Sequence, residues 1–214
     1  DGAGPLKHRA QRTVYNANGQ PTYAEVGTVN GVSEADWLGF VSLQQAWTYY
    51  GANGRTSRES VSASGVNYSV VDYTYDALGR TDCVAQRLNP AVWGVQEWAC
   101  TGQAPGSAGP DRISKTIYDA AGQVVQVQSA LGTSAQQNVL QTYNANGTQA
   151  SLTDGKGNKT TFIYDGFDRA METHYPLPNT PGQVSNTDYE GVQRDADGNV
   201  TVRRTRVGQI RTYT

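Results

Sequence analysis

Residues 75–80 read Tyr-Asp-Ala-Leu-Gly-Arg, and the tyrosine and glycine of this stretch return along the whole chain. In each copy three residues separate the tyrosine from a glycine, or from Asp168 in the sixth copy. The pairs are Tyr15–Gly19, Tyr50–Gly54, Tyr75–Gly79, Tyr118–Gly122, Tyr143–Gly147 and Tyr164–Asp168. A seventh copy keeps Gly198 but has Arg194 in the tyrosine position. This periodicity predicts a repeat protein, in which each unit buries its apolar face only against its neighbours.

The residues between the tyrosine and the glycine predict a tight turn. The tyrosine is usually followed by Asp or Asn, at Asn16, Asp76, Asp119, Asn144 and Asp165. Such a side chain can bond the backbone two residues on, and glycine adopts positive φ without steric cost. A type I turn with a left-handed glycine and a bulge commonly joins antiparallel strands. Each copy therefore predicts a β-hairpin, and the whole chain a mainly all-β fold of repeated antiparallel hairpins.

Composition predicts a thin sheet. Val, Leu, Ile and Phe account for 37 of the 214 residues, whereas the chain has 13 Tyr and 24 Gly. This balance is typical of a sheet whose faces are partly exposed to solvent. The net charge of only −2 does not indicate the basic surface that nucleic-acid binding needs. The basic run at residues 203–206 is expected to be a solvated strand, with an anion or partner contact as the alternative. The sequence contains neither an apolar stretch of membrane-spanning length nor a signal peptide.

Two insertions interrupt the repeat pattern of what we expect to be a single array over residues 1–214. They lie at about residues 30–47 and 83–110. Ser33 with an acid three residues on predicts a helix over residues 34–46, and Asn89-Pro90 predicts another over residues 91–99. Both helices would lie against the sheet as lids. Their anchors would be the four tryptophans, Trp37, Trp47, Trp93 and Trp98.

Cys83 and Cys100 lie within the second insertion and form a candidate disulfide. A bridge closing a loop of this size would stabilise the fold by about 3 kcal/mol and would imply an oxidising destination. Two free buried thiols are the alternative, because sequence does not give the distance between the Cα atoms.

Both ends of the chain stop within the pattern. Asp1–Gly4 resembles the internal turn at residues 154–157, and residues 211–214 resemble the approach to a tyrosine turn. We expect a fragment of a longer array, since natural arrays carry atypical capping units at their ends. Its first and last strands would leave open β edges through which copies could self-associate.

The motifs at residues 75–80 and 118–123, with the Asp-Gly-Lys-Gly-Asn turn at 154–158 before Tyr164, resemble the YD-repeat, or RHS-repeat, family. The resemblance covers nearly the whole chain. It implies a curved or spiralling β-sheet shell, like the shells that enclose the C-terminal toxin domain of bacterial polymorphic toxins and insecticidal toxin complexes. Related shells occur in teneurins, which act in cell adhesion. The family's core segment with its self-cleaving aspartate is absent from this sequence, so self-cleavage is not assigned.

The sequence offers no catalytic, cofactor or metal site. His8 and His174 have no partner pattern, and signatures of nucleophilic, zinc or phosphate-loop chemistry are missing. Residues 195–199 resemble a calcium loop, but the glycine falls fourth and Arg206 stands where a glutamate ligand is needed. The repeat carboxylates are spaced for turns rather than for paired acid–base chemistry.

These features favour a structural role. The first hypothesis is a non-enzymatic shell segment of a secreted or surface protein of bacterial origin, with the rest of the array and an enclosed toxin domain as partners. The alternative is a cell-surface adhesion or carbohydrate-binding module, because tryptophan faces beside polar residues can stack on sugar rings.

Overall fold

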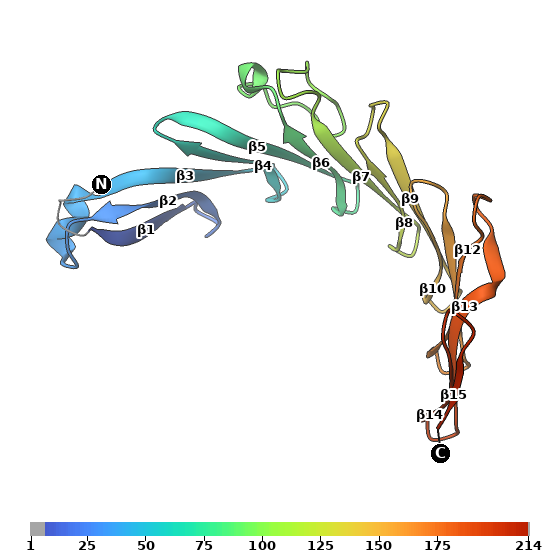
Figure 1. Ribbon diagram of the computed structural model, residues 1–214. Helices are drawn as coiled ribbons and strands as arrows, with labels where there is room; N and C mark the ends of the chain where they lie inside the picture. The colour runs from blue at the N-terminus through green and yellow to red at the C-terminus, as the bar shows by residue number, and fades with distance from the viewer. Residues whose placement is uncertain (1–6, 214) are drawn as a thin grey trace. The chain divides into compact units, whose positions relative to one another are not determined.

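The computed structural model describes residues 7–213, so the turn predicted at Asp1–Gly4 lies outside the described residues. Fifteen antiparallel strands form one open sheet whose order is the chain order (Figure 1). The strands are β1 (His8–Tyr15), β2 (Pro21–Val29), β3 (Val41–Tyr50), β4 (Thr56–Ala63), β5 (Val66–Tyr75), β6 (Thr81–Arg87), β7 (Arg112–Tyr118), β8 (Val124–Ser129), β9 (Gln137–Tyr143), β10 (Gln149–Thr153), β11 (Lys159–Tyr164), β12 (Ala170–Pro176), β13 (Val184–Arg194), β14 (Val200–Arg204) and β15 (Ile210–Thr212). The predicted all-β fold of repeated hairpins is confirmed.

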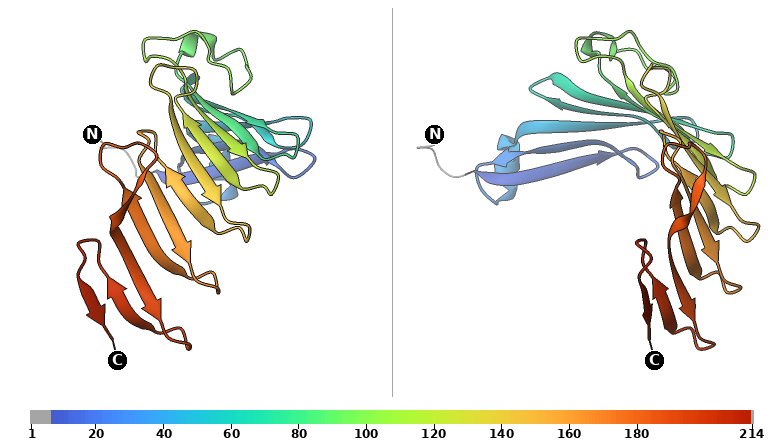
Figure 2. Two further views of the ribbon diagram at one scale, coloured as in Figure 1. Left: turned by 90° about the vertical axis from the view of Figure 1, so that its right-hand side faces the viewer. Right: turned by 45° about the vertical axis from the view of Figure 1, so that its right-hand side comes forward.

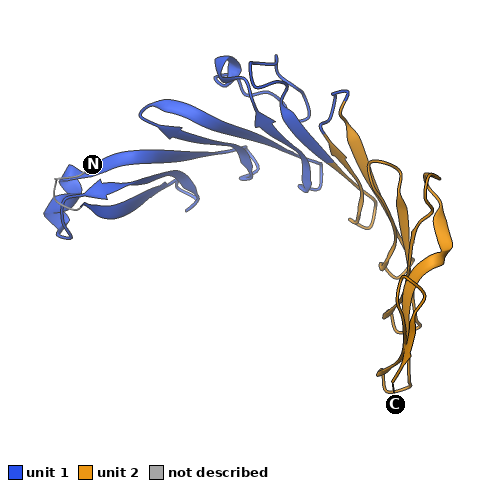
Figure 3. Ribbon diagram, viewed as in Figure 1, with its two compact units in different colours: residues 1–115, 130–134 blue, residues 116–129, 135–214 orange. Residues whose placement is uncertain are grey.

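The chain divides into two compact units (Figure 3). The first comprises residues 1–115 and 130–134, and the second comprises residues 116–129 and 135–214. Each unit is a meander, in which a strand pairs with the strand before it and the strand after it.

Connections alternate between the two ends of the strands. Every tyrosine turn joins an odd-numbered strand to the next even-numbered strand, so within each unit these turns follow one another along one end (Figure 2). The opposite end carries connections of varied length, from the two residues between β4 and β5 to residues 88–111 between β6 and β7. The two predicted insertions fall at this variable end.

The predicted helix over residues 34–46 is wrong. Only Glu34–Gly39 is helical, as a 3-10 segment (η1), and β3 begins at Val41. The capping pattern is real, because the Ser33 backbone N–H donates to the Asp36 carboxylate at 2.9 Å. Beyond the cap, residues of β3 pair with both β2 and β4, and this cross-strand pairing overrides the helical spacing.

The second predicted helix, over residues 91–99, is also wrong. Helical structure is confined to Pro90–Val92 (η2), where Asn89 Oδ1 caps the turn by accepting from the Ala91 N–H at 3.1 Å. Gly94 follows at once and disfavours continuation, so residues 93–111 run as an irregular loop. Among residues 7–213, no helix has the length and apolar character needed to cross a bilayer.

Buried side chains are more often polar than apolar in the described part of the chain. The buried hydrophobic residues are Val29, Val70, Cys83, Ala85, Ala99 and Ile113. The buried polar residues are Glu25, Arg58, Ser60, Ser62, Asp72, Thr74, Arg87, Asp111, Ser151 and Ser185. Because so little apolar surface is covered, hydrogen bonds and ion pairs must hold much of the sheet in place.

Candidate functional site

Each tyrosine turn is closed by the same two backbone hydrogen bonds. After Tyr75, the Asp76 N–H donates to the Arg80 carbonyl and the Gly79 N–H donates to the Asp76 carbonyl, both at 2.9 Å. A register shift between Thr74 and Tyr75 marks the accompanying bulge. The same pair of bonds closes the turns after Tyr15, Tyr50, Tyr118, Tyr143, Tyr164 and Arg194.

The fourth turn residue has left-handed backbone in every copy. The value of φ lies between +73° and +90° at Gly19, Gly54, Gly79, Gly122, Gly147 and Gly198. Asp168, which replaces the glycine, has φ +61° and keeps the turn, because Asp tolerates this region better than most residues.

In most copies the first turn residue, directly after the tyrosine, caps the turn with its side chain. Asp76 Oδ1 accepts from the N–H groups of Leu78 and Arg80 at 2.9 Å, and its Oδ2 accepts from Arg80 Nε at 2.7 Å. Asp165 repeats the pattern, and Asp119 Oδ1 accepts from the Gln123 N–H. Burial opposes ionisation of Asp76 and Asp165, but these hydrogen bonds outweigh it and lower the pKa of both carboxyls.

The repeated tyrosine reaches back to the preceding hairpin. In four copies its hydroxyl donates to the carbonyl of the second residue after that hairpin's glycine. These bonds run from Tyr50 to Pro21 (2.8 Å), Tyr75 to Thr56 (2.8 Å), Tyr143 to Val124 (2.9 Å) and Tyr164 to Gln149 (2.9 Å). The repeated tyrosine therefore links one repeat to the next. This link, rather than the chemistry of the turn, explains why a tyrosine recurs at this position.

A second set of side-chain contacts joins successive turns. In several copies the residue after the glycine points at the glycine of the next turn: Gln20 Nε2 donates to the Gly54 carbonyl at 2.7 Å, and Gln123 Nε2 donates to the Gly147 carbonyl at 3.3 Å. Arg55 lies against Gly79 in the same way, in the space that a Cβ would occupy.

Arg194 interrupts the tyrosine row. Its Nη1 donates to the Gly198 carbonyl within its own turn, at 3.3 Å. The neighbouring basic run makes contacts within the chain: the Arg204 guanidinium lies 3.7 Å from the centroid of the Tyr189 ring, and Arg206 forms two hydrogen bonds to Asp188. The calcium-like segment is an ordinary turn, in which Asp195 Oδ1 accepts from the Asn199 N–H at 2.8 Å.

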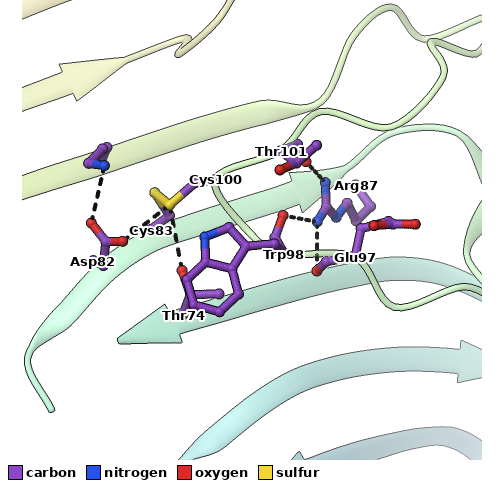
Figure 4. Close-up of a disulfide and its surroundings, with 9 residues drawn as sticks. Thr74, Asp82, Cys83, Arg87, Glu97, Trp98, Cys100 and Thr101 are labelled. Carbon is purple, nitrogen blue, oxygen red and sulfur yellow. Dashed lines mark hydrogen bonds and ion pairs between the residues drawn. A yellow bond between two sulfur atoms is a disulfide. The ribbon is translucent and has the colours of Figure 1, made fainter. Parts of the chain in front are cut away.

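Residues 88–111, here called the strap, are tied to β6 by a disulfide. The Cys83 and Cys100 sulfurs are bonded to each other, with their Cα atoms 5.3 Å apart (Figure 4). Asp82 lies beside the two sulfurs, and the three residues have the proximity of a metal site. Sulfurs that are joined in a disulfide are not thiolate ligands, however, so this group does not offer a metal site in its oxidised form.

A network of four buried charges lies under the strap. Arg58 forms a two-pronged ion pair with Asp72, with Nε–Oδ1 and Nη2–Oδ2 distances of 2.5 and 3.0 Å. Arg87 bridges Asp72 at 2.7 Å and Asp111 at 2.8 Å. Burial raises the pKa of Asp111, but the N–H groups of Gln103 and Leu88 together with Arg87 lower it overall. Buried ion pairs of this kind are tolerated only when their hydrogen bonds are satisfied.

The two arginines of this network also hold the strap by its backbone. Arg58 donates to the carbonyls of Trp93 (2.8 Å) and Val95 (3.1 Å). Arg87 donates to the carbonyls of Glu97, Trp98 and Thr101, as Figure 4 shows. Sequence reasoning missed this network, because its members come together only through strand register and share no spacing along the chain.

The two histidines lie on strands. His8 is exposed on β1. His174 lies within β12, where its Nε2 is 2.8 Å from Glu172 Oε2, its Nδ1 is 3.1 Å from the Ser185 carbonyl oxygen, and its ring stacks on Tyr189.

The tryptophans do not anchor helical lids. Trp37 of η1 stacks on Phe40, and Trp47 of β3 packs against Tyr23 at 4.1 Å between ring centroids. Trp93 and Trp98 belong to the irregular strap. Trp37, Trp47 and Trp98 are 45%, 40% and 57% exposed, so they leave aromatic surface open on the molecule.

Comparison with known proteins identifies one family. The RHS Repeat model matches residues 143–180, which contain two tyrosine turns, and this match confirms the resemblance that the motifs indicate. Among curated proteins none matches the chain. Solved structures that are similar include a Photorhabdus luminescens Tc holotoxin pore (12% identity, 96% of this chain and 12% of that chain, TM-score 0.46) and a TcdB2-TccC3-TEV crystal structure (16% identity, 95% and 12%, TM-score 0.41). The chain thus spans about 12% of the length of these proteins.

Proposed function

We propose that this chain, which carries an RHS repeat at residues 143–180, is a structural segment of a secreted or cell-surface protein of bacterial origin. Its hairpins would form part of a curved or spiralling β-shell that encloses or presents a C-terminal toxin or effector domain. Its partners would be the rest of the same array and the enclosed domain. In this proposal the segment has no enzymatic activity and needs neither cofactor nor metal.

The tyrosine link between successive hairpins is the observation that carries this proposal. Each hydroxyl-to-carbonyl bond joins a hairpin to the one before it, as Tyr75 does with Thr56 and Tyr164 with Gln149. A sheet joined in this way grows by adding equal pieces, and it does not depend on a second layer to hold the pieces together. Extension without a packed core is what a thin wall requires.

Protease protection in the protein encoded by the whole gene tests the proposal. We expect the domain that follows the array to resist protease, and to be cleaved sooner when Tyr143 and Tyr164 are both changed to Ala. Tyr68→Ala is the matched control, because Tyr68 is 53% exposed on β5 and lies outside the repeat positions. Equal cleavage in all three proteins, or a gene that encodes no domain after the array, would overturn the proposal.

A binding role is a second candidate, favoured by the open aromatic surface. Trp98 is the most exposed of the tryptophans, and it borders a surface hollow that Arg55 and Tyr75 also line. An aromatic face beside hydrogen-bonding groups suits a sugar ring. Glycan-array binding that Trp98→Ala abolishes would support this role, and an array without a signal would exclude it.

The outer edges of the sheet offer a route to self-association. β1 and β15 are the first and last strands, and each pairs on one side only among the described residues. Unpaired strand edges can pair with another copy. We propose that polypeptides of residues 1–214 associate through them, and sedimentation that is independent of concentration would contradict this.

A further inference from the structure

We propose that the sheet face around Arg12 and Glu25 binds an irregular polypeptide segment through its backbone carbonyls, in the way that the strap binds beside Arg58 and Asp72. This inference goes beyond the proposed function, because it assigns a binding site and the chemistry of its ligand. It does not depend on what the array encloses.

Two arginine–carboxylate pairs in the first unit have the same construction. Arg12 on β1 stands directly opposite Glu25 on β2, and Arg58 on β4 stands directly opposite Asp72 on β5. In both pairs an arginine Nε bonds a carboxylate that is almost completely buried, with Glu25 3% and Asp72 1% exposed.

Both pairs lie on the same face of the sheet. Directly opposed residues of neighbouring antiparallel strands share a face. One such row runs through Tyr23, Trp47, Ser60, Val70 and Arg87, and it connects the surroundings of Glu25 to the surface that the strap covers. The proposed site is therefore continuous with an interface that the molecule already forms.

The strap shows what this face binds. Arg58 and Arg87 together donate to five backbone carbonyls of one irregular segment, and Gln96 of that segment donates to the Ser57 carbonyl at 3.2 Å. Recognition is thus mainly of the peptide backbone. Asp72 and Asp111 together neutralise the two guanidinium groups, whose other hydrogen bonds within the described residues go to neutral backbone carbonyls.

At Arg12 the equivalent N–H groups are open. Its Nε bonds Glu25, whereas Nη1 and Nη2 make no hydrogen bond within residues 7–213, and the side chain is 55% exposed. Burial raises the pKa of Glu25, but hydrogen bonds from Tyr23, Arg12 and Ser42 outweigh this and lower it. An ionised Glu25 balances the charge of Arg12, so the site favours peptide carbonyls over phosphate groups.

Aromatic side chains surround the open guanidinium. Phe40 lies over Gly27 and 5.0 Å from the Arg12 guanidinium, measured to its ring centroid, and Trp37 stacks on Phe40. On the other side Trp47 packs against Tyr23 and is 40% exposed. Open rings of this kind bury the apolar side chains of a bound segment at low entropic cost.

The chain's own strap sequence supplies the probe. A synthetic peptide of residues 91–99, Ala-Val-Trp-Gly-Val-Gln-Glu-Trp-Ala, is titrated into the ¹⁵N-labelled protein, and the Arg12 Nε and Trp47 Nε1 signals are followed. We expect both signals to shift, and Arg12→Lys to weaken the binding at least fivefold, because lysine lacks the planar fork of donors. Arg9→Lys is the matched control, since Arg9 lies on β1 with its side chain on the opposite face.

Three outcomes would overturn the inference. They are the absence of binding at millimolar peptide, shifts confined to Arg58 and Arg87 through displacement of the strap, and equal weakening by the Arg9 and Arg12 variants. Chitohexaose is titrated in parallel, and shifts at Trp47 with this sugar but not with the peptide would show a carbohydrate site instead. The signal mapping uses the unaltered protein, so it decides the question even if Arg12→Lys fails to fold.

Discussion

At the scale of single residues, the hydroxyl group distinguishes tyrosine from any other aromatic residue in the repeat. Tyr164 donates to the Gln149 carbonyl at 2.9 Å, and Tyr164→Phe removes this bond while keeping the ring. The carbonyl loses its partner, so we expect the free energy of unfolding to fall by about 1 kcal/mol. Urea denaturation followed by circular dichroism measures the change.

Tyr15 provides the control for this substitution. It holds the same motif position, but no hairpin precedes it among the described residues and it is 60% exposed. Tyr15→Phe should leave the unfolding free energy unchanged within about 0.3 kcal/mol. An equal loss at both positions would mean that the hydroxyl link is not what stabilises the repeat.

Asp111 makes stability dependent on pH in the acid range. Its folded-state pKa is lowered, so its contribution is present above the unfolded pKa of about 3.9 and is lost as the pH falls below it. Between pH 5 and pH 3 the melting temperature of the wild type should therefore fall more steeply than that of Asp111→Asn. If the melting temperatures of the two proteins fall equally between pH 5 and pH 3, the buried network is not the cause of the pH dependence.

At the scale of elements, the turn glycines are needed for two separate reasons. Gly79 has φ +79°, and a Cβ there would also meet the Arg55 guanidinium. Gly19 has φ +76° with open space around it. Left-handed backbone alone costs an alanine about 1–2 kcal/mol, so we expect Gly19→Ala to lose about that much. Gly79→Ala should lose only slightly more, because the Arg55 guanidinium ends a flexible side chain and can move aside. Chemical denaturation of both variants gives the comparison.

The double variant Arg55→Ala with Gly79→Ala separates the two reasons. In the Arg55→Ala background, Gly79→Ala should lower the free energy of unfolding by as much as Gly19→Ala does in the wild type. Each loss is measured against the protein that keeps the glycine in question. If Arg55→Ala brings no such relief, the contact between neighbouring turns does not constrain the glycine.

The strap depends on the disulfide as well as on the buried ion pairs. Cys83→Ser with Cys100→Ser removes a cross-link over a 17-residue separation, and about 3 kcal/mol of stability should be lost through the greater freedom of the unfolded chain. The ion network does not involve either cysteine, so the variant should still fold. Guanidinium denaturation tests this, and an unchanged midpoint would contradict it.

The hairpins could be predicted because their determinants are local. Asp76 and Gly79 specify their turn from within four residues, whatever the rest of the chain does. The helix expected over residues 34–46 failed for the opposite reason, since Val41–Tyr50 gains two strand partners that only the folded sheet provides. The network of Arg58, Asp72, Arg87 and Asp111 likewise arises from register, which no spacing along the sequence reveals.

At the scale of the whole molecule, stability should be uneven. In a meander each strand is supported only by its neighbours, so protection follows local burial rather than one shared core. Burial is concentrated in β4, β5, β6 and the strap, where Val70, Asp72, Cys83, Ala85 and Arg87 are almost inaccessible. At the other extreme, all three residues of β15 are exposed.

Hydrogen exchange read by mass spectrometry tests this distribution. Backbone amides of β5 and β6 should exchange slowest and those of β15 fastest, with β9 to β12 between them, because opening β15 breaks one ladder whereas opening β6 must also release the disulfide-bound strap. Reduction of the disulfide should speed exchange in β6 and the strap but leave β11 and β12 unchanged. Equal rates in all strands would show that the sheet unfolds as one cooperative body, and the view of the molecule as a chain of locally linked repeats would then be wrong.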